Sequence, residues 1–229
     1  MFRKNLIRNL VISVVAVVVV VIIVILGGQS NTESKETTLV DPTIPRGIAP
    51  DGTPFLGNSE APVTIVLYED MGCPNCRAFE QTVEPAIIKD FILNGEVKLQ
   101  VITLAFVNRE SLPGAEALAC AADQSKFWDF RALLFSNQGK KSFTRQNLVE
   151  MANEINLDQK LFTNCYDLQK HSKAITDQTQ QAFEFGIEAT PTFEINGERY
   201  VGVYPYEVIG TSQEGVKAFI QQALSEVKQ

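Results

Sequence analysis

The hydrophobic positions of the chain follow three different patterns. Residues 10–26 (LVISVVAVVVVVIIVIL) form one continuous run that contains no charge. The shorter β-branched runs 61–68 and 97–106 are typical of buried strands. From about 115 to 185, apolar residues recur at spacings of three and four, which predicts helices. The chain therefore combines a membrane-like segment with an α/β domain.

The first run has the length of a transmembrane helix. Its seventeen residues span about 26 Å at 1.5 Å per residue, close to a bilayer core of roughly 30 Å. We expect a transmembrane anchor over residues 10–28. The basic residues Arg3, Lys4 and Arg8 predict that segment 1–9 is cytoplasmic and that the remaining chain is extracytoplasmic.

A cleaved signal peptide is the alternative interpretation of this run. Cleavage after Gly28 or Gly27 places Leu26 or Ile25 at position −3, where small residues are preferred. A single-pass anchor is therefore favoured, and both interpretations export the domain to an oxidising compartment. The polar, proline-bearing segment 29–50 is predicted to be a flexible tether.

The predicted domain covers residues 51–229 and begins with a strand, a helix and a second strand. This order favours a parallel strand pair with a right-handed crossover. Pro85 lies inside the first helical pattern and is expected to kink it. A helical insertion follows over about 110–186, with four helices and breaks at Gly139 and Asn156.

The last part of the domain is predicted to return to the sheet. Residues 190–195 form a strand pattern, and Asn196-Gly197 is a strong signal for a hairpin turn into 198–203. An amphipathic helix is expected over 211–227.

Composition limits the function. The net charge of −7 argues against nucleic acid as a partner, because phosphate binding needs clustered Lys and Arg. Four cysteines in 229 residues are too few for a disulfide-dense scaffold. They are enough for two pairs.

The motif Cys73-Pro74-Asn75-Cys76 lies between a predicted strand and a predicted helix. Such a motif indicates a zinc half-site or a redox dithiol. Zinc is disfavoured, since the other cysteines lie 45 residues apart and the only histidine, His171, fits a solvated helical position. At a helix N-terminus, free backbone N–H groups and the helix dipole stabilise a Cys73 thiolate, and Cys76 becomes the buried resolving thiol.

At this point the chain resembles the DsbA-like thiol:disulfide oxidoreductases of thioredoxin fold, over roughly residues 55–227. The resemblance rests on four groups of residues: Asp70 with Cys73-Pro74-Asn75-Cys76, Ala119–Gln124 with Phe127-Trp128, Leu157-Asp158 with Phe162 and Cys165, and Ala189–Phe193 with Asn196-Gly197. It implies a thioredoxin-like α/β fold with a helical insertion.

The resemblance also implies roles for individual residues. Cys73 is the attacking thiol, and Pro191, preceded by Thr190, is a cis-proline beside the dithiol; an ordinary proline at a strand start is the alternative. Asp70 either tunes the site or is a solvated or capping acid. Many relatives carry an acid where this chain has Leu67, which puts their proton relay to the resolving thiol in doubt here.

The polar but uncharged Asn75 stands where the most oxidising relatives often have histidine. We therefore expect a redox potential less extreme than theirs.

Cys120 and Cys165 both lie on predicted helices of the insertion. In an exported protein an even pair favours a structural disulfide. Two free buried thiols and a second redox pair are the alternatives.

These observations lead to a functional hypothesis. The chain is expected to be a membrane-anchored enzyme that introduces disulfides into exported bacterial proteins through Cys73 and Cys76, without a cofactor or metal. The family implies reoxidation by a membrane partner of the DsbB or vitamin K epoxide reductase type. A reductase or isomerase of the same fold and a non-enzymatic binding module are the alternatives.

Overall fold

A computed structural model describes residues 40–207 and 214–227 of the chain, all within the compact unit Thr37–Gln229. The predicted transmembrane segment 10–28 lies outside the described residues. Within the described residues, no helix combines the length and the apolar character needed to cross a bilayer.

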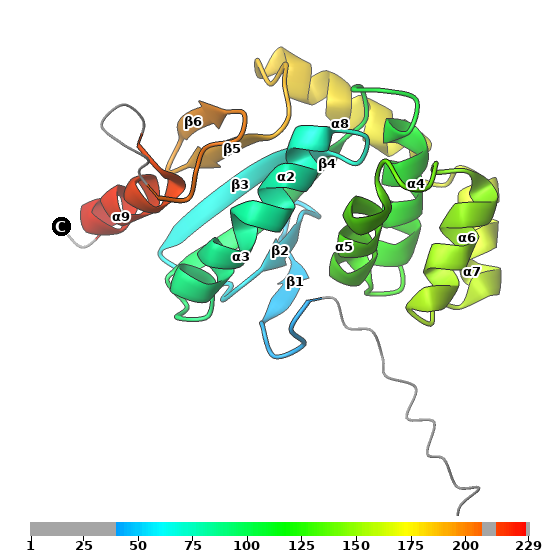
Figure 1. The fold of residues 1–229 in the computed structure, drawn as a ribbon, viewed down its shortest axis with the longest axis horizontal. Helices are drawn as coiled ribbons and strands as arrows, with labels where there is room; N and C mark the ends of the chain where they lie inside the picture. Colours follow the sequence, from blue (N-terminus) through cyan, green and yellow to red (C-terminus); the bar gives the residue numbers. More distant parts are fainter. Residues whose placement is uncertain (1–39, 208–213, 228–229) are drawn as a thin grey trace, which may run out of the picture. The chain divides into compact units, whose positions relative to one another are not determined.

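The described part contains a six-stranded sheet with the strand order β1-β2-β4-β3-β5-β6 (Figure 1). The strands are β1 (Arg46–Ile48), β2 (Pro54–Leu56), β3 (Val63–Asp70), β4 (Val97–Leu104), β5 (Thr192–Ile195) and β6 (Glu198–Val201). The central strands β3 and β4 are parallel, as the strand–helix–strand pattern predicted, and the other pairs are antiparallel. This mixed sheet is the core of a thioredoxin-like α/β fold.

The helices fall into three groups. The crossover between β3 and β4 contains α2 (Pro74–Thr82), α3 (Glu84–Ile87) and the π-helical turn η1 (Ile88–Ile92). The insertion contains α4 (Ser111–Ala122), α5 (Phe127–Asn137), α6 (Arg145–Glu154), α7 (Gln159–Asp167) and α8 (Ser172–Glu184). The last described helix is α9 (Val216–Val227), which lies against β3 and β5. Figure 1 shows α4 to α7 gathered beside the sheet, away from α9.

The first crossover helix breaks where the sequence predicted a kink. Helix α2 ends at Thr82, and α3 begins at Glu84 with Pro85 in its first turn. Proline has no N–H to donate and clashes with the preceding turn, so it starts a new helix more readily than it continues an old one.

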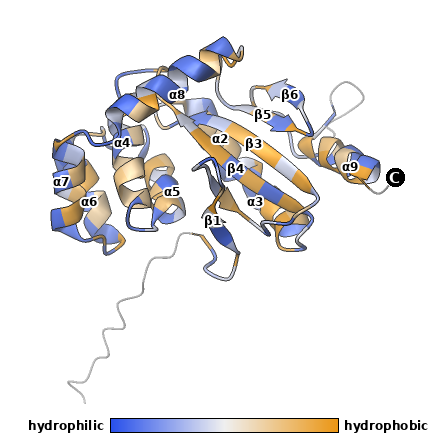
Figure 2. Ribbon diagram, turned by 180° about the vertical axis from the view of Figure 1, so that it is seen from behind, coloured by the Kyte–Doolittle hydropathy of each residue, from blue (hydrophilic) through white to orange (hydrophobic). Residues whose placement is uncertain are grey.

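The apolar face of β3 is central to the core. Val63, Ile65 and Leu67 are buried in the main hydrophobic cluster, whereas Tyr68 packs on a second, smaller cluster with Leu104. In Figure 2 the ribbon of β3 is predominantly hydrophobic and that of the edge strand β6 predominantly hydrophilic. The strand is therefore covered on both faces, which explains its continuous apolar sequence.

Two predictions need correction. The segment 29–50 is not a tether throughout, because Arg46–Ile48 forms the edge strand β1 and Ile44 is buried. The insertion has five helices rather than four among the described residues. Gly139 and Asn156 do mark breaks, with φ of 78° and 58°.

Candidate active site

Cys73 lies at the point where β3 gives way to α2. It is the N-cap residue of α2, Pro74 occupies the first turn, and the Cys73 N–H donates to the Asp70 carbonyl oxygen at 2.9 Å. Both cysteines are buried free thiols, whereas Pro74 and Asn75 are exposed. The motif thus presents its two middle residues to solvent directly beside the dithiol.

The surroundings of Cys73 favour its thiolate. They lower the pKa of the Cys73 thiol to about 6, chiefly because the Cys76 side chain hydrogen-bonds to the sulfur. Burial opposes this effect, and the Thr190 side chain and the backbone N–H groups of Cys76 and Asn75 reinforce it. These N–H groups belong to the first turn of α2, which has no intrahelical acceptors for them.

Cys76 behaves in the opposite way. Burial raises the pKa of the Cys76 thiol strongly, and the nearby Cys73 and Glu69 raise it further. The Asp70 N–H points at its sulfur at 3.4 Å. Cys76 therefore remains a protonated thiol that can donate to the Cys73 thiolate.

A loop that is distant in sequence closes the site. The Thr190–Pro191 peptide bond is cis, and the carbonyl oxygen of Thr190 lies 3.2 Å from the Cys73 sulfur. The buried Thr190 hydroxyl lowers the Cys73 pKa, although it has no partner with full hydrogen-bond geometry among the described residues. The ring of Phe193 packs on that of Phe79 at 5.6 Å, which fixes β5 against α2.

Asp70 holds the active-site turn in place. Its buried carboxylate accepts from the Gly72 N–H at 2.7 Å, and from the N–H groups of Phe106 and Val107 at 2.8 and 3.0 Å. The contacts favour the capping interpretation of this residue, because they join the turn after β3 to the loop after β4.

Gln138 supports the same turn from the helical insertion, a role that sequence reasoning missed. Its buried amide donates to the carbonyl oxygens of Met71 at 2.7 Å and Cys73 at 3.1 Å. Arg77 on α2 in turn donates to the Gln138 backbone carbonyl. A pocket of about 230 Å³ beside Pro74 is lined by Gln138 and Phe143, among others.

A buried ion cluster lies behind the dithiol. Arg131 on α5 forms two-pronged contacts of 2.7–2.8 Å with Glu69 on β3 and Glu84 on α3. Burial raises the pKa of Glu69, and Arg131 only partly offsets this. Glu80, one helical turn after Cys76, has its pKa raised to about 7 by burial. The only sequence signal for the cluster is charges within otherwise apolar elements.

The second cysteine pair forms a disulfide between α4 and α7. Cys120 and Cys165 are bonded, with their Cα atoms 5.8 Å apart. The dithiol at Cys73 and Cys76 belongs to no group of three potential metal ligands within the described ranges.

A thiolate-forming dithiol that faces a cis-proline on a mixed sheet is the arrangement of a thiol:disulfide oxidoreductase of thioredoxin fold. The family model described as Thioredoxin matches residues 50–221, so the chain belongs to this family. Together with the relatives below, the match makes it a DsbA-like member, as the sequence motifs predicted.

Three relatives illustrate the likeness. Disulfide bond formation protein D of Bacillus subtilis is 30% identical over 173 residues, which cover 69% of this chain and 74% of that protein. The crystal structure of oxidised BdbD from Bacillus subtilis has a TM-score of 0.66 at 26% identity and covers 78% of this chain and 96% of that one. The Na⁺/H⁺ antiporter NhaA 1 of Salinispora arenicola is 30% identical over 76% of this chain, but the match spans only 26% of the antiporter.

Proposed function

We propose that this oxidoreductase introduces disulfide bonds into exported proteins through Cys73 and Cys76. The observation that carries the proposal is the lowered pKa of Cys73 at the start of α2. A stabilised thiolate favours the reduced enzyme, and this makes the Cys73–Cys76 disulfide a stronger oxidant.

The proposed reaction begins with the oxidised enzyme. A substrate thiolate attacks the Cys73 sulfur, the Cys73–Cys76 bond breaks, and Cys76 leaves and takes up a proton. A second substrate thiolate then attacks the substrate sulfur of the mixed disulfide and expels Cys73. Cys73 is a good leaving group, because its pKa of about 6 keeps it a thiolate at neutral pH. The substrate loses two electrons and the enzyme gains them.

The surroundings of Cys73 suit a polypeptide substrate. Next to the cis peptide, the backbone at Thr190 is positioned to pair with an extended chain. The pocket beside Pro74 offers room for a neighbouring side chain. The relatives named for disulfide bond formation support this choice of substrate class.

The proposal includes the cellular setting. Residues 10–28 anchor the chain, the domain lies outside the cytoplasmic membrane, and a quinone-linked membrane partner of the DsbB or vitamin K epoxide reductase type reoxidises the dithiol. The apolar run, the preceding basic residues and the family resemblance support this arrangement.

Two measurements test the proposed function. The oxidised full chain should restore disulfides to a reduced, unfolded model protein, and Cys73→Ser should abolish this activity; unchanged oxidation by that variant would leave only a binding role. The Cys73–Cys76 potential should lie above that of thioredoxin, about −270 mV. A value at or below that level would assign the chain to the reductases instead.

A further inference from the structure

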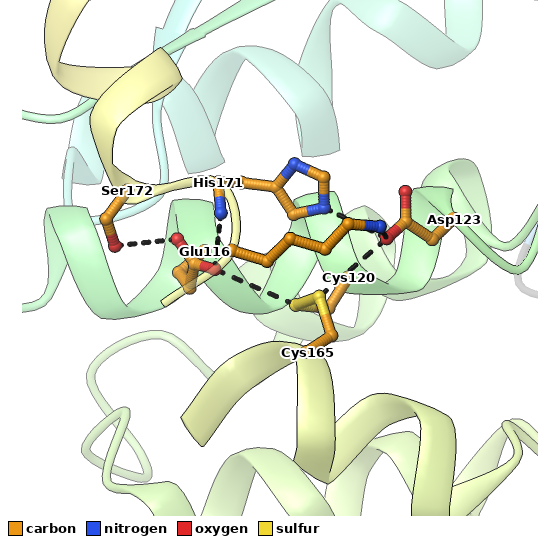
Figure 3. A network of polar contacts seen from close by, with 7 residues as sticks. Glu116, Cys120, Asp123, Cys165, His171 and Ser172 are labelled. Atoms are coloured by element: carbon orange, nitrogen blue, oxygen red, sulfur yellow. Dashed lines mark hydrogen bonds and ion pairs between the residues drawn. A yellow bond between two sulfur atoms is a disulfide. The ribbon is translucent and has the colours of Figure 1, made fainter. Parts of the chain in front are cut away.

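The only histidine of the chain lies beside the disulfide of the helical insertion. Cys120 belongs to α4, Cys165 to α7, and His171 caps the start of α8. Figure 3 shows His171 and Asp123 next to the bonded sulfurs. Three helices therefore bring together side chains that the sequence separates by up to 51 positions.

The distances fit the ligand set of a metal ion. The sulfurs of Cys120 and Cys165 and a ring nitrogen of His171 all lie within 4.8 Å of one another. Asp123 Oδ2 lies 3.0 Å from His171 Nε2 and 3.8 Å from the Cys165 sulfur. Around tetrahedral zinc, ligand atoms are roughly 3.3–3.8 Å apart, given Zn–S near 2.3 Å and Zn–N or Zn–O near 2.1 Å. Small side-chain movements would bring these atoms to zinc.

The sulfurs cannot bind zinc while they are bonded to each other, because the metal ligand is the thiolate. We propose that reduction of the Cys120–Cys165 disulfide creates a zinc site formed by both thiolates, the His171 imidazole and the Asp123 carboxylate. A dithiol reductant supplies two electrons and two protons, breaks the disulfide and becomes a disulfide itself. Zinc then displaces both thiol protons to solvent.

The neighbouring charges suit a divalent cation. Zinc with two thiolates and one carboxylate carries a single negative charge, and Lys170 Nζ lies 2.6 Å from Asp123 Oδ2 to balance it. The Glu116 carboxylate accepts from the backbone N–H of His171 at 2.9 Å and from the Ser172 hydroxyl at 2.7 Å. These contacts fix the start of α8 and so hold the histidine in place.

The site is also accessible. An open pocket of about 440 Å³ is lined by both cysteines, Asp123 and Lys170. Cys165 is 8% exposed and Cys120 is fully buried, so a reductant reaches the disulfide from the Cys165 side of this pocket. Zinc would then keep α4 and α7 connected after the covalent bond is lost.

The test uses the full chain in detergent, with Cys73→Ser and Cys76→Ser to remove the other thiols. The chain is reduced with a phosphine, the phosphine is removed under anaerobic conditions, and the reduced chain is dialysed against zinc chloride. We expect the reduced chain to bind one zinc ion and the oxidised chain none. Cobalt in place of zinc should give thiolate charge-transfer absorption and the intense visible bands of tetrahedral coordination. Helical circular dichroism is recorded in parallel.

Variants distinguish the built site from adventitious thiolate binding. His171→Gln and Asp123→Asn should each weaken zinc binding at least about tenfold. Asp167→Asn, which removes an exposed carboxylate paired with Arg145 on α6, should leave it unchanged. The proposal would be overturned if the oxidised and reduced chains bound zinc equally. It would also be overturned if His171→Gln and Asp123→Asn both bound zinc as tightly as the parent chain. If reduction lowers the helical signal, zinc must restore it with the same stoichiometry, and failure to do so also overturns the proposal.

Discussion

The two thiols of the active-site motif differ in their protonation because they face different surroundings. Cys73 meets the open N–H groups of a helix start, whereas Cys76, three residues later, is enclosed by β3 and the buried Glu69. The largest contribution to the lowered pKa of Cys73 comes from the Cys76 side chain itself. The reactivity of one cysteine thus depends on the proton held by the other.

This dependence gives a prediction for two matched variants. Cys76→Ala removes the donor, so the Cys73 pKa should rise from about 6 toward the unperturbed value of about 8.5. Cys76→Ser keeps an O–H donor and should hold the pKa closer to the parent value. The pH dependence of Cys73 alkylation in the reduced chain measures both, since only the thiolate reacts. If both variants kept the parent midpoint, the helix terminus and not Cys76 would control the thiolate.

At the scale of elements, the Glu69–Arg131–Glu84 cluster joins β3, α5 and α3 behind the dithiol. One guanidinium pairs with two buried carboxylates, so the cluster carries more negative than positive charge when both acids are ionised. Burial raises the pKa of Glu69, and a buried acid with a raised pKa stabilises the fold most when it is protonated.

Arg131→Met should therefore destabilise the protein in a pH-dependent way. Removing the cation leaves two uncompensated carboxylates and should lower the free energy of unfolding by about 3–5 kcal/mol at neutral pH. The loss should be smaller at pH 5 than at pH 8, because the raised pKa of Glu69 favours its neutral form at lower pH. Urea titrations at both pH values measure it.

The control for this prediction replaces all three charged side chains of the cluster by apolar side chains of similar volume. Combining Arg131→Met with Glu69→Leu and Glu84→Leu should recover most of the lost stability, since well-packed apolar replacements of buried ion clusters are often neutral. A triple variant as unstable as Arg131→Met alone would show that packing around Arg131, not charge, holds these elements together.

The elements also show how far sequence could go. Strands β3 and β4 were predicted within two residues of their observed ends, because each is a continuous buried run. Strands β1 and β2 were missed, since each has three residues and depends on pairing with its neighbours. The dithiol is a local motif and could be found. The contacts from the insertion could not, because no spacing encodes that Gln138 donates to the Cys73 carbonyl or that Arg131 pairs with Glu69.

At the scale of the whole molecule, the described unit follows an apolar run in the sequence. This run and the domain differ in the solvent that stabilises them. A helix of seventeen apolar residues without charge is stable in a bilayer, where backbone groups must pair internally. In water its β-branched sequence is a poor helix former. In the proposed function, the run holds the domain at the membrane, close to the partner proposed to reoxidise its dithiol.

The last prediction concerns this attachment. The full chain should stay with the membrane after an alkaline wash, with its N-terminus intact by mass spectrometry. A chain that begins at Thr37, the start of the compact unit, and is exported behind a cleavable signal peptide should be released yet retain its thiol–disulfide exchange with a small model substrate. Its oxidation of proteins in the cell should slow, because reoxidation would then require diffusional encounter with the membrane partner rather than contact within reach of a tether. If the full-length product were instead soluble and cleaved after Gly27 or Gly28, the run would be a signal peptide. The rate of reoxidation in the cell would then be the same for both exported chains.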